Sequence, residues 1–220
     1  YDWAIWLFEK ARQHFPNSKL VINDFELENN PAGIDEMLNL VKVLRDRGLI
    51  DGFGTQAHCF NVDGLANTPN TLKTNLDRMA RSGVPVYVTE LDLNGGNNPS
   101  EALQLKSYQN LFPIYWDHPA VGGITLWGYV EGATWKEGTG LLNANGTKRS
   151  AMTWLENYVA GRLDVGYPYC SGGTIIDPPI AENNLTNGEF DEGTLGWDMQ
   201  YNNNTSGNFT IVTNANMSGT

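Results

Sequence analysis

The sequence is poor in cysteine and contains neither a cluster of basic residues nor a long apolar run. Its two cysteines, Cys59 and Cys170, are too few for a disulfide framework and too far apart for a paired metal-binding motif. Cys59 follows an apolar stretch, so we expect a buried thiol there. The three histidines are scattered along the chain and form no metal-binding pattern, and we expect neither a metal nor a cofactor.

Two further absences narrow the class of partner. No stretch approaches the ~18 consecutive apolar residues of a membrane span, so we expect no membrane partner. No run of Lys or Arg offsets the net charge of −11, and an acidic surface repels phosphate backbones, so we expect no nucleic acid partner. What is abundant is glycine (24 residues), tryptophan (7) and tyrosine (9). This composition favours a neutral polar ligand with flat apolar faces, such as a sugar.

Helical and strand patterns alternate over residues 1–160. Apolar residues at helical spacing predict five helices, and short β-branched runs between them predict four strands. The predicted strands are 19–23, 50–57, 85–91 and 121–127, and the predicted helices are 3–15, 37–44, 72–79, 100–115 and 150–158. Strands separated by helices imply parallel pairing through right-handed crossovers.

Polar and aromatic residues follow the end of each predicted strand: Asn23 and Asp24, Gln56 and His58, Glu90 and Asp92, and Trp127. A TIM barrel holds its active site at this end of its strands, whereas a doubly wound sheet would need a Gly-rich phosphate loop after its first strand, which the sequence lacks. A full barrel has eight strands. We therefore predict an α/β fold for residues 1–160, the C-terminal (β/α)4 portion of a TIM (β/α)8 barrel.

The pattern changes after residue 160. Gly, Pro, Tyr and Ser predominate over 161–182, which we interpret as a linker. Residues 183–220 are rich in turn residues and contain a short alternating segment at 208–213, which indicates the beginning of a β-sandwich.

Glu90 is the first candidate for catalytic chemistry. It lies near the end of a buried strand, Asp92 lies two residues on and points to the same face, and His58 ends the neighbouring strand. A Glu–His–Asp hydrogen-bond chain would keep the Glu90 carboxylate ionised and oriented. The alternative is a structural ion pair that closes the rim of the sheet.

Four segments resemble glycoside hydrolase family 10, the endo-β-1,4-xylanases. VTELDL at 88–93 looks like the nucleophile strand of that family, and GFGTQAHCF at 52–60 is similar to the strand before it. KLVINDFELEN at 19–29 and GITLWGYVEGATW at 123–135 resemble two further strands, the second with its paired tryptophans. The four motifs occur in the family's order and cover nearly all of 1–160. A single TELD motif would be weak, but this series is specific.

The resemblance implies a retaining, endo-acting hydrolase of β-1,4-xylan that needs no cofactor. Glu90 would be the nucleophile that forms a covalent glycosyl-enzyme, because an anion beneath the anomeric carbon stabilises an oxocarbenium-like transition state. His58 and Asp92 would orient Glu90, and Gln56 would reach the sugar 2-hydroxyl or the nucleophile. We expect such an enzyme to be secreted and to act outside the cell.

The resemblance also implies a sugar-binding cleft. Trp127 and Trp135 would stack on pyranose rings, with core packing as the alternative for each, and Asn23 would line the cleft. Trp3, Trp6 and Trp154 lie at helical spacing and are instead expected to pack in the core or in the outer shell of the barrel. His14 and His118, beside prolines at helix ends, are expected at the surface.

One element of the family pattern has no counterpart in this sequence. A retaining glycosidase needs a second carboxylate as acid and base, and in family 10 it lies on the fourth strand, before the helix with which this sequence opens. Four glutamates are available, but none occurs in the matching context: Glu26, Glu28, Glu131 and Glu137. We therefore assign no acid/base residue and expect a missing N-terminal barrel half, in the same or a companion chain, as a partner beside xylan or xylo-oligosaccharides.

The C-terminal segment has a resemblance of its own. NLTNGEFDEG at 184–193, followed by LGW at 195–197, is similar to the opening strand of family 4/9/22-type carbohydrate-binding modules. The alternative is a disordered linker rich in Asn and Thr. For the whole chain, the other functional hypotheses are a different retaining barrel glycanase, such as a β-mannanase or endoglucanase, and a non-catalytic glycan-binding protein that keeps the cleft and lacks the acid.

Overall fold

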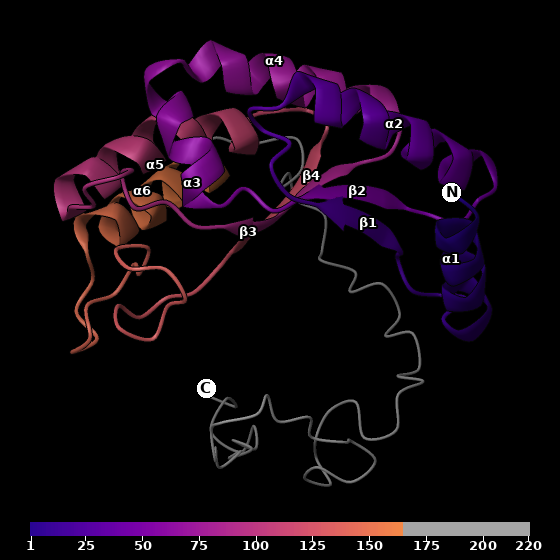
Figure 1. Ribbon diagram of the computed structural model, residues 1–220. Coiled ribbons are helices and arrows are strands. Elements are labelled where there is room, and N and C mark those ends of the chain that lie inside the picture. Colours follow the sequence, from indigo (N-terminus) through magenta and orange to yellow (C-terminus); the bar gives the residue numbers. More distant parts are fainter. Residues whose placement is uncertain (165–220) are drawn as a thin grey trace, which may run out of the picture. The chain divides into compact units, whose positions relative to one another are not determined.

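The computed structural model describes residues 1–164 (Figure 1). The predicted module at 183–220, and all of the predicted linker beyond residue 164, lie outside the described residues. Within residues 1–164, no helix is long and apolar enough to cross a membrane.

Four strands alternate with helices along the described chain. The order is α1 (Asp2–His14), β1 (Val21–Asp24), α2 (Pro31–Asp46), β2 (Gly52–Thr55), α3 (Cys59–Val62), α4 (Pro69–Met79), β3 (Val86–Leu91), α5 (Glu101–Trp116), β4 (Val121–Leu126) and α6 (Ser150–Asp164). Two short 3-10 helices, η1 (Asp63–Asn67) and η2 (Ala80–Ser82), follow α3 and α4. All four predicted strands and five predicted helices are present, and the sequence analysis missed only α3 and the short 3-10 helices.

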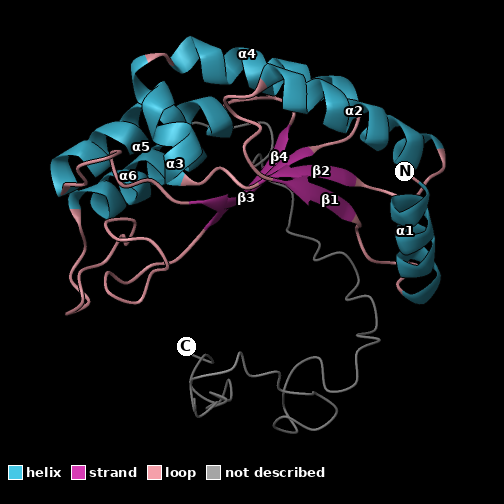
Figure 2. Cartoon of the chain, in the orientation of Figure 1, coloured by secondary structure: helices cyan, strands magenta, loops and turns pink. Residues whose placement is uncertain are grey.

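The strands form one parallel sheet in the order β1-β2-β3-β4, so that each strand pairs with its neighbour in sequence (Figure 2). In the register, Val21 lies opposite Gly52, Phe53 opposite Val86, and Val86 opposite Val121. Because all strands run in the same direction, their carboxyl ends meet at one edge of the sheet. The predicted α/β fold with a parallel sheet is confirmed.

The helices cover one face of this sheet (Figure 1). Alternate residues of β3, such as Val86 and Val88, point into a core that also receives apolar side chains from α2, α4 and α5. The fully buried members of this core include Ile34, Val41, Leu44, Phe53, Leu72, Leu76, Met79, Leu111 and Tyr115. The core therefore holds the strands from the helical side, and the opposite face of the sheet is free to carry polar side chains.

Close packing explains a glycine in β2. A Cβ atom on Gly52 would lie 2.6 Å from the Tyr87 ring, so only glycine allows this ring of β3 to lie across the neighbouring strand.

Side chains also fix where three helices begin. The Asn30 side chain accepts the Gly33 amide at the start of α2, and Ser100 accepts the Leu103 amide at the start of α5. Helix α6 is capped from outside its own segment, because the Glu101 carboxylate accepts both the amide and the hydroxyl of Ser150. These two hydrogen bonds lower the pKa of Glu101 and join α6 to α5.

Three expectations about packing, for Trp3, Trp6 and His118, were wrong. Trp3 and Trp6 are 72% and 59% exposed, because α1 buries only Ala4 against the described residues. His118 is buried: its Nε2 lies 3.1 Å from Asp77 Oδ1, and its Nδ1 accepts the Ala120 amide. Helical spacing reveals that a helix has an apolar face, but not which element covers it.

The other two expectations of this kind were correct. His14 is exposed at the end of α1. Trp154 is partly buried on α6 and stacks on Tyr158, with ring centroids 4.9 Å apart, while Phe112 meets it edge-on.

We expect a polypeptide of residues 1–164 alone to self-associate. The sheet has open edges at β1 and β4, and the exposed tryptophans of α1 add an apolar patch. Size-exclusion chromatography with light scattering over a concentration series measures this, and replacing Trp3 and Trp6 by Gln should lower the average mass. A monodisperse monomer throughout the series would contradict the expectation.

Candidate active site

The candidate site forms where β2 and β3 end. Beyond the regular strands, His58 and Asp92 continue the parallel pairing as an isolated bridge. The Glu90 amide donates to the Gln56 carbonyl, at 2.9 Å, in the same stretch. The backbone therefore brings the ends of these two strands together before any side chain makes a contact.

Glu90, His58 and Asp92 form a continuous chain. His58 Nε2 lies 3.2 Å from Glu90 Oε2, and His58 Nδ1 lies 3.1 Å from Asp92 Oδ2. The side chains of Asp92 and His58 are 1% and 7% exposed, whereas that of Glu90 is 19% exposed. The structure thus brings together the three residues that the sequence analysis grouped, and only Glu90 is open to a ligand.

Both ring nitrogens of His58 are engaged. One faces a Glu90 oxygen and the other an Asp92 oxygen. The ring is therefore fixed between the two carboxylates and holds the Glu90 side chain in place.

Asp92 receives two further donors. Its Oδ1 accepts the Cys59 amide at 2.8 Å, and its Oδ2 accepts the indole N–H of Trp135 at 2.6 Å. A buried carboxylate without such partners would be strongly disfavoured. Of Glu90, His58 and Asp92, Asp92 therefore has the most hydrogen-bond partners from the protein and is the least exposed to water.

The two predicted platform tryptophans are both at the surface. Trp135 is 56% exposed, and its ring meets His58 edge-on with centroids 4.7 Å apart and Phe60 with centroids 6.0 Å apart. Trp127 is 43% exposed and directly follows β4, where its amide donates to the Leu91 carbonyl. Their exposure argues against core packing for either residue.

Gln56 and Asn23 lie at the ends of β2 and β1. The Gln56 side chain is half-buried, and its backbone joins Asp24 and Glu90 through hydrogen bonds of 3.0 Å and 2.9 Å. Asn23 is exposed, and its Oδ1 accepts the Thr89 hydroxyl at 3.0 Å. Gln56 is thus tied to β3 by its backbone, and Asn23 lies on β1, one strand further away.

Two features next to His58, the backbone of Ala57 and the buried Glu28, were missed by the sequence analysis. Ala57 is fully buried in the left-handed region, with φ +64°, and this unusual conformation turns the chain between β2 and His58. Glu28 lies fully buried beneath this turn and accepts the Thr55 hydroxyl. Burial raises the pKa of Glu28, against the opposing effect of the Thr55 hydrogen bond. Neither the φ angle nor the burial of a glutamate is visible in a sequence pattern.

The other glutamates considered as acids divide into two groups. Glu28 and Glu131 are already engaged, Glu28 with Thr55 and Glu131 with Arg149 at 3.0 Å. Glu26 and Glu137 are exposed. Glu28 and Glu131 are therefore held by structural contacts, and the structure assigns neither of them the role of a proton donor.

A cavity of about 630 Å³ lies beside the site. Its lining includes Cys59, Phe60, Asp63, Asn94, Lys136 and Glu137, which come from the segments that follow β2, β3 and β4. Within residues 1–164, no group of three or more His, Cys, Asp or Glu side chains is arranged to hold a metal ion. The chemistry available at this edge is that of carboxylates, an imidazole and exposed aromatic rings.

A parallel sheet with helices on one face, and a carboxylate site at the carboxyl ends of its strands, is the arrangement found in (β/α)-barrel proteins. The chain belongs to glycosyl hydrolase family 10, whose family model matches residues 1–158. The family resemblance of residues 1–160 is thereby confirmed, whereas the residues predicted to begin a carbohydrate-binding module lie outside the matched range.

Known relatives agree with this assignment. The chain is 41% identical over 157 residues to endo-1,4-beta-xylanase B of Cellvibrio japonicus, a match that covers 71% of this chain and 24% of that protein. Native xylanase 10B of Thermotoga maritima superimposes with a TM-score of 0.63 at 24% identity, over 74% of this chain and 53% of that one, which shows a shared fold.

A second solved structure is the intracellular xylanase TsXylA of Thermoanaerobacterium saccharolyticum, as a mutant in complex with xylotetraose. It has a TM-score of 0.59 at 28% identity and covers 69% of this chain and 48% of that one. The chain thus spans about half the length of these solved xylanases and a quarter of the Cellvibrio relative.

The reactivity of the Cys59 thiol tests whether this residue is buried in the native protein. Burial, followed by the nearby carboxylates of Asp92 and Asp63, raises the pKa of the Cys59 thiol to about 12. The reactive thiolate is therefore scarce at pH 8, and we expect iodoacetamide to leave Cys59 unmodified in the native protein and to modify it in urea. Mass spectrometry of the Cys59 peptide measures this, and rapid native labelling would contradict it.

Proposed function

We propose that this chain supplies the nucleophile-bearing part of a retaining endo-β-1,4-xylanase. The observation that carries the proposal is the Glu90 carboxylate, which lies at the carboxyl end of β3, is partly open to solvent and is held by His58 at 3.2 Å. A partly exposed carboxylate held in position by a buried imidazole suits a glycosyl nucleophile. The structural ion pair considered as the alternative would leave the exposure of Glu90 unexplained.

The reaction has two displacements. A Glu90 oxygen attacks the anomeric carbon and forms a glycosyl ester, while the glycosidic bond breaks and the leaving oxygen takes a proton from a carboxylic acid on the complementary barrel half. Water then attacks the same carbon, gives its proton to that carboxylate and releases Glu90. The sugar product keeps its anomeric configuration because the carbon is inverted twice.

His58 and Asp92 do not touch the reacting carbon. The His58 ring, with its Nε2 3.2 Å from Glu90 Oε2, holds the Glu90 carboxylate in position before attack and again when the glycosyl ester breaks. Asp92 fixes the ring through Nδ1, and the Trp135 indole fixes Asp92. The nucleophile is therefore oriented through a relay of three buried or half-covered groups.

The cleft residues follow from the same geometry. Trp127 directly follows β4 and Trp135 lies against His58, and both are exposed, so that their faces can bind the apolar faces of pyranose rings. Gln56 would reach the 2-hydroxyl of the sugar or the nucleophile, and Asn23 would line the cleft further along. These contacts would hold several sugar units, which suits attack within a chain.

The choice of xylan is supported by the relatives. The Cellvibrio relative is named an endo-1,4-beta-xylanase, and the TsXylA structure holds xylotetraose. A β-mannanase or an endoglucanase would use the same nucleophile. Xylose lacks the hydroxymethyl group of glucose and mannose, so comparing activity on xylan, glucan and mannan is a direct measure of substrate choice.

The proposal includes a complementary N-terminal barrel half, in the same polypeptide or a companion chain. The open edge of β1 and the uncovered aromatic face of α1, with Trp3 and Trp6 exposed, provide the surface on which it would pack. That half would bring the acid, and general acid catalysis alone contributes about 10²–10⁴-fold to a rate.

Two further parts of the proposal rest on the sequence. Residues 183–220 would begin a carbohydrate-binding module, which would raise the local concentration of the enzyme on an insoluble polysaccharide. Secretion is proposed because polymeric xylan lies outside the cell.

We expect Glu90→Gln to reduce turnover by several orders of magnitude once the chain is assembled with its complementary half, because an amide is a poor nucleophile at the anomeric carbon. A 2-fluoro-xylobioside inactivator should add one glycosyl group to the Glu90 peptide, as seen by mass spectrometry. Glu137→Gln is the matched control, since it removes an exposed carboxylate nearby.

Labelling of another carboxylate, with an active Glu90→Gln variant, would refute the assignment. Binding of xylo-oligosaccharides without any hydrolysis by the assembled protein would instead favour the non-catalytic glycan-binding protein.

The two tryptophans should differ in what their loss does. We expect Trp127→Ala and Trp135→Ala each to weaken binding of xylo-oligosaccharides by about 1–3 kcal/mol, since each removes a large ring from the cleft. Only Trp135→Ala should also lower kcat, because Trp135 is the one of these two tryptophans that donates to Asp92. Isothermal titration and steady-state kinetics measure these effects. Equal losses of kcat in both variants would contradict the distinction.

A further inference from the structure

Both platform tryptophans lie in one long irregular connection between β4 and α6. Residues 127–149 contain no helix or strand, only isolated bridges such as that between Val130 and Leu142. The Trp135 ring is 56% exposed, and its indole N–H still makes a 2.6 Å bond to the buried Asp92. Something other than regular secondary structure must hold this connection at a fixed distance from the Glu90–His58–Asp92 chain.

A buried arginine lies at the base of this connection. Arg149 is 7% exposed, and its Nη1 donates to Glu131 Oε2 at 3.0 Å, to the Gly140 carbonyl at 3.0 Å and to the Gly138 carbonyl at 3.3 Å. The Glu131 carboxylate in turn accepts the amides of Gly138 and Gly140 at 2.9 Å and 3.0 Å. The turn at 138–140 is therefore bonded to the ion pair in two ways. Its carbonyl oxygens accept from Arg149, and its amides donate to Glu131.

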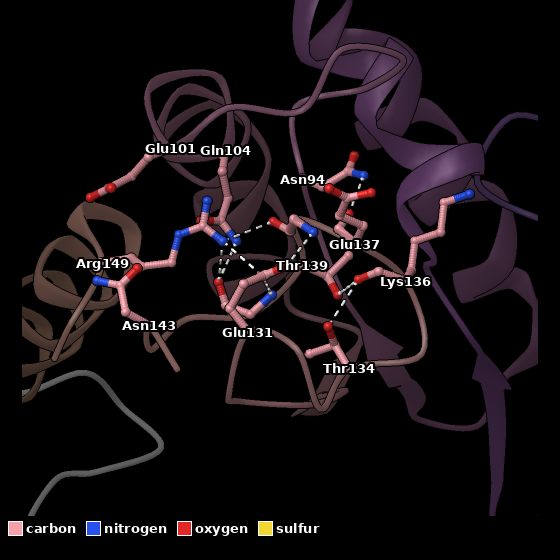
Figure 3. Close-up of polar contacts among 12 residues, drawn as sticks. Asn94, Glu101, Gln104, Glu131, Thr134, Lys136, Glu137, Thr139, Asn143 and Arg149 are labelled. Carbon is pink, nitrogen blue, oxygen red and sulfur yellow. Dashed lines mark hydrogen bonds and ion pairs between the residues drawn. The ribbon is translucent and has the colours of Figure 1, made fainter. Parts of the chain in front are cut away.

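A third side chain ties this turn to the segment that follows β3. Gln104 of α5 is fully buried and lies beside Glu131 and Arg149 (Figure 3). Its Nε2 donates to the Gly140 carbonyl at 2.9 Å and to the Leu93 carbonyl at 3.0 Å. Position 140 leaves no room for a side chain, because a Cβ there would lie 2.5 Å from the Glu131 nitrogen. We call Gln104, Glu131 and Arg149 the loop clamp.

The clamp holds the segment that carries Trp135 against the residues that carry Asp92. Leu93 accepts from Gln104, and Asn94 donates through Nδ2 to the Glu137 carbonyl at 3.0 Å. Asp92, immediately before them, accepts the Trp135 indole. Three consecutive residues after the nucleophile are thus each bonded to the connection or to the clamp, so displacement of the turn displaces the indole.

We propose that Arg149 and Glu131 are positioning residues for the nucleophile, acting through Trp135. The inference rests on the proposed role of Glu90. The clamp keeps the indole N–H on Asp92 Oδ2, which fixes the carboxylate that orients His58, and it keeps the same ring ready for a sugar. Neither Arg149 nor Glu131 touches substrate, and both act at a distance by setting the position of one exposed ring.

The direct measurement is the indole N–H signal of Trp135 in the assembled protein. With ¹⁵N-labelled tryptophan, this signal is identified by its loss in Trp135→Phe, and a short bond to a carboxylate places it downfield of a solvated indole. We expect Arg149→Met to move it towards the solvated position. Glu131→Gln serves as a second, milder variant if Arg149→Met does not fold. Lys148→Met is the matched control. It removes a positive charge at the neighbouring position, where Lys148 forms only an exposed ion pair with Glu156.

Kinetics separate positioning from general destabilisation. At a temperature where all variants are folded, we expect Arg149→Met to lower kcat/KM on xylohexaose by about 10²-fold, the loss typical of a misplaced positioning contact. In a Trp135→Phe background the same substitution should cost less than threefold, because the contact through which Arg149 acts is already absent.

Two outcomes would overturn the inference. One is an unmoved indole signal in both clamp variants, and the other is a loss in Arg149→Met that is equally large with and without the Trp135 indole. The indole measurement needs no catalysis. An assembled protein without xylanase activity would therefore contradict the proposed function and leave this signal to decide the role of the clamp.

Discussion

The rest of the site depends on one constraint, the burial of the Asp92 carboxylate. A charge that is 1% exposed is stable only if protein groups replace its water, and here three donors do so: the Cys59 amide, the His58 ring and the Trp135 indole. The first two donors belong to consecutive residues that follow β2, and the third belongs to the β4–α6 connection. Satisfying this single group therefore requires the end of β2, the end of β3 and the β4–α6 connection to meet at one point, and that meeting point is the candidate site.

The same strand places two carboxylates in opposite environments. Glu90 lies in β3, Asp92 directly follows β3, and both contact the same imidazole, yet Glu90 keeps an opening to solvent while Asp92 is enclosed. A difference of two residues along the strand thus separates a group that can react from a group that can only orient. The imidazole between them transmits the difference, because each of its nitrogens serves one carboxylate.

Much of this could be predicted from the sequence, since the relevant signals are periodic or lie at strand ends. Apolar spacing gave the four strands and five main helices, and the parallel order placed Gln56, His58, Glu90 and Asp92 at one edge. What could not be predicted depends on tertiary contacts without a local signature. Two contacts join residues whose spacing shows no pattern: the bond from Trp135 to Asp92 and the ion pair of Glu131 with Arg149. The left-handed backbone of Ala57 likewise has no signature in the sequence. The errors at Trp3, Trp6 and His118 have the same cause, because burial is decided by the neighbour and not by the residue.

The order of the sheet has a consequence for how such a chain reaches its native state. In the described sheet, β2, β3 and β4 each pair with the strand that precedes them in sequence, at separations of roughly thirty to thirty-six residues. No later strand is inserted between two earlier ones. Each new strand–helix unit can therefore dock as soon as it leaves the ribosome, and no earlier pairing has to be undone. The sheet can grow in the direction of synthesis, with the β4–α6 connection, and the indole that completes the environment of Asp92, added last.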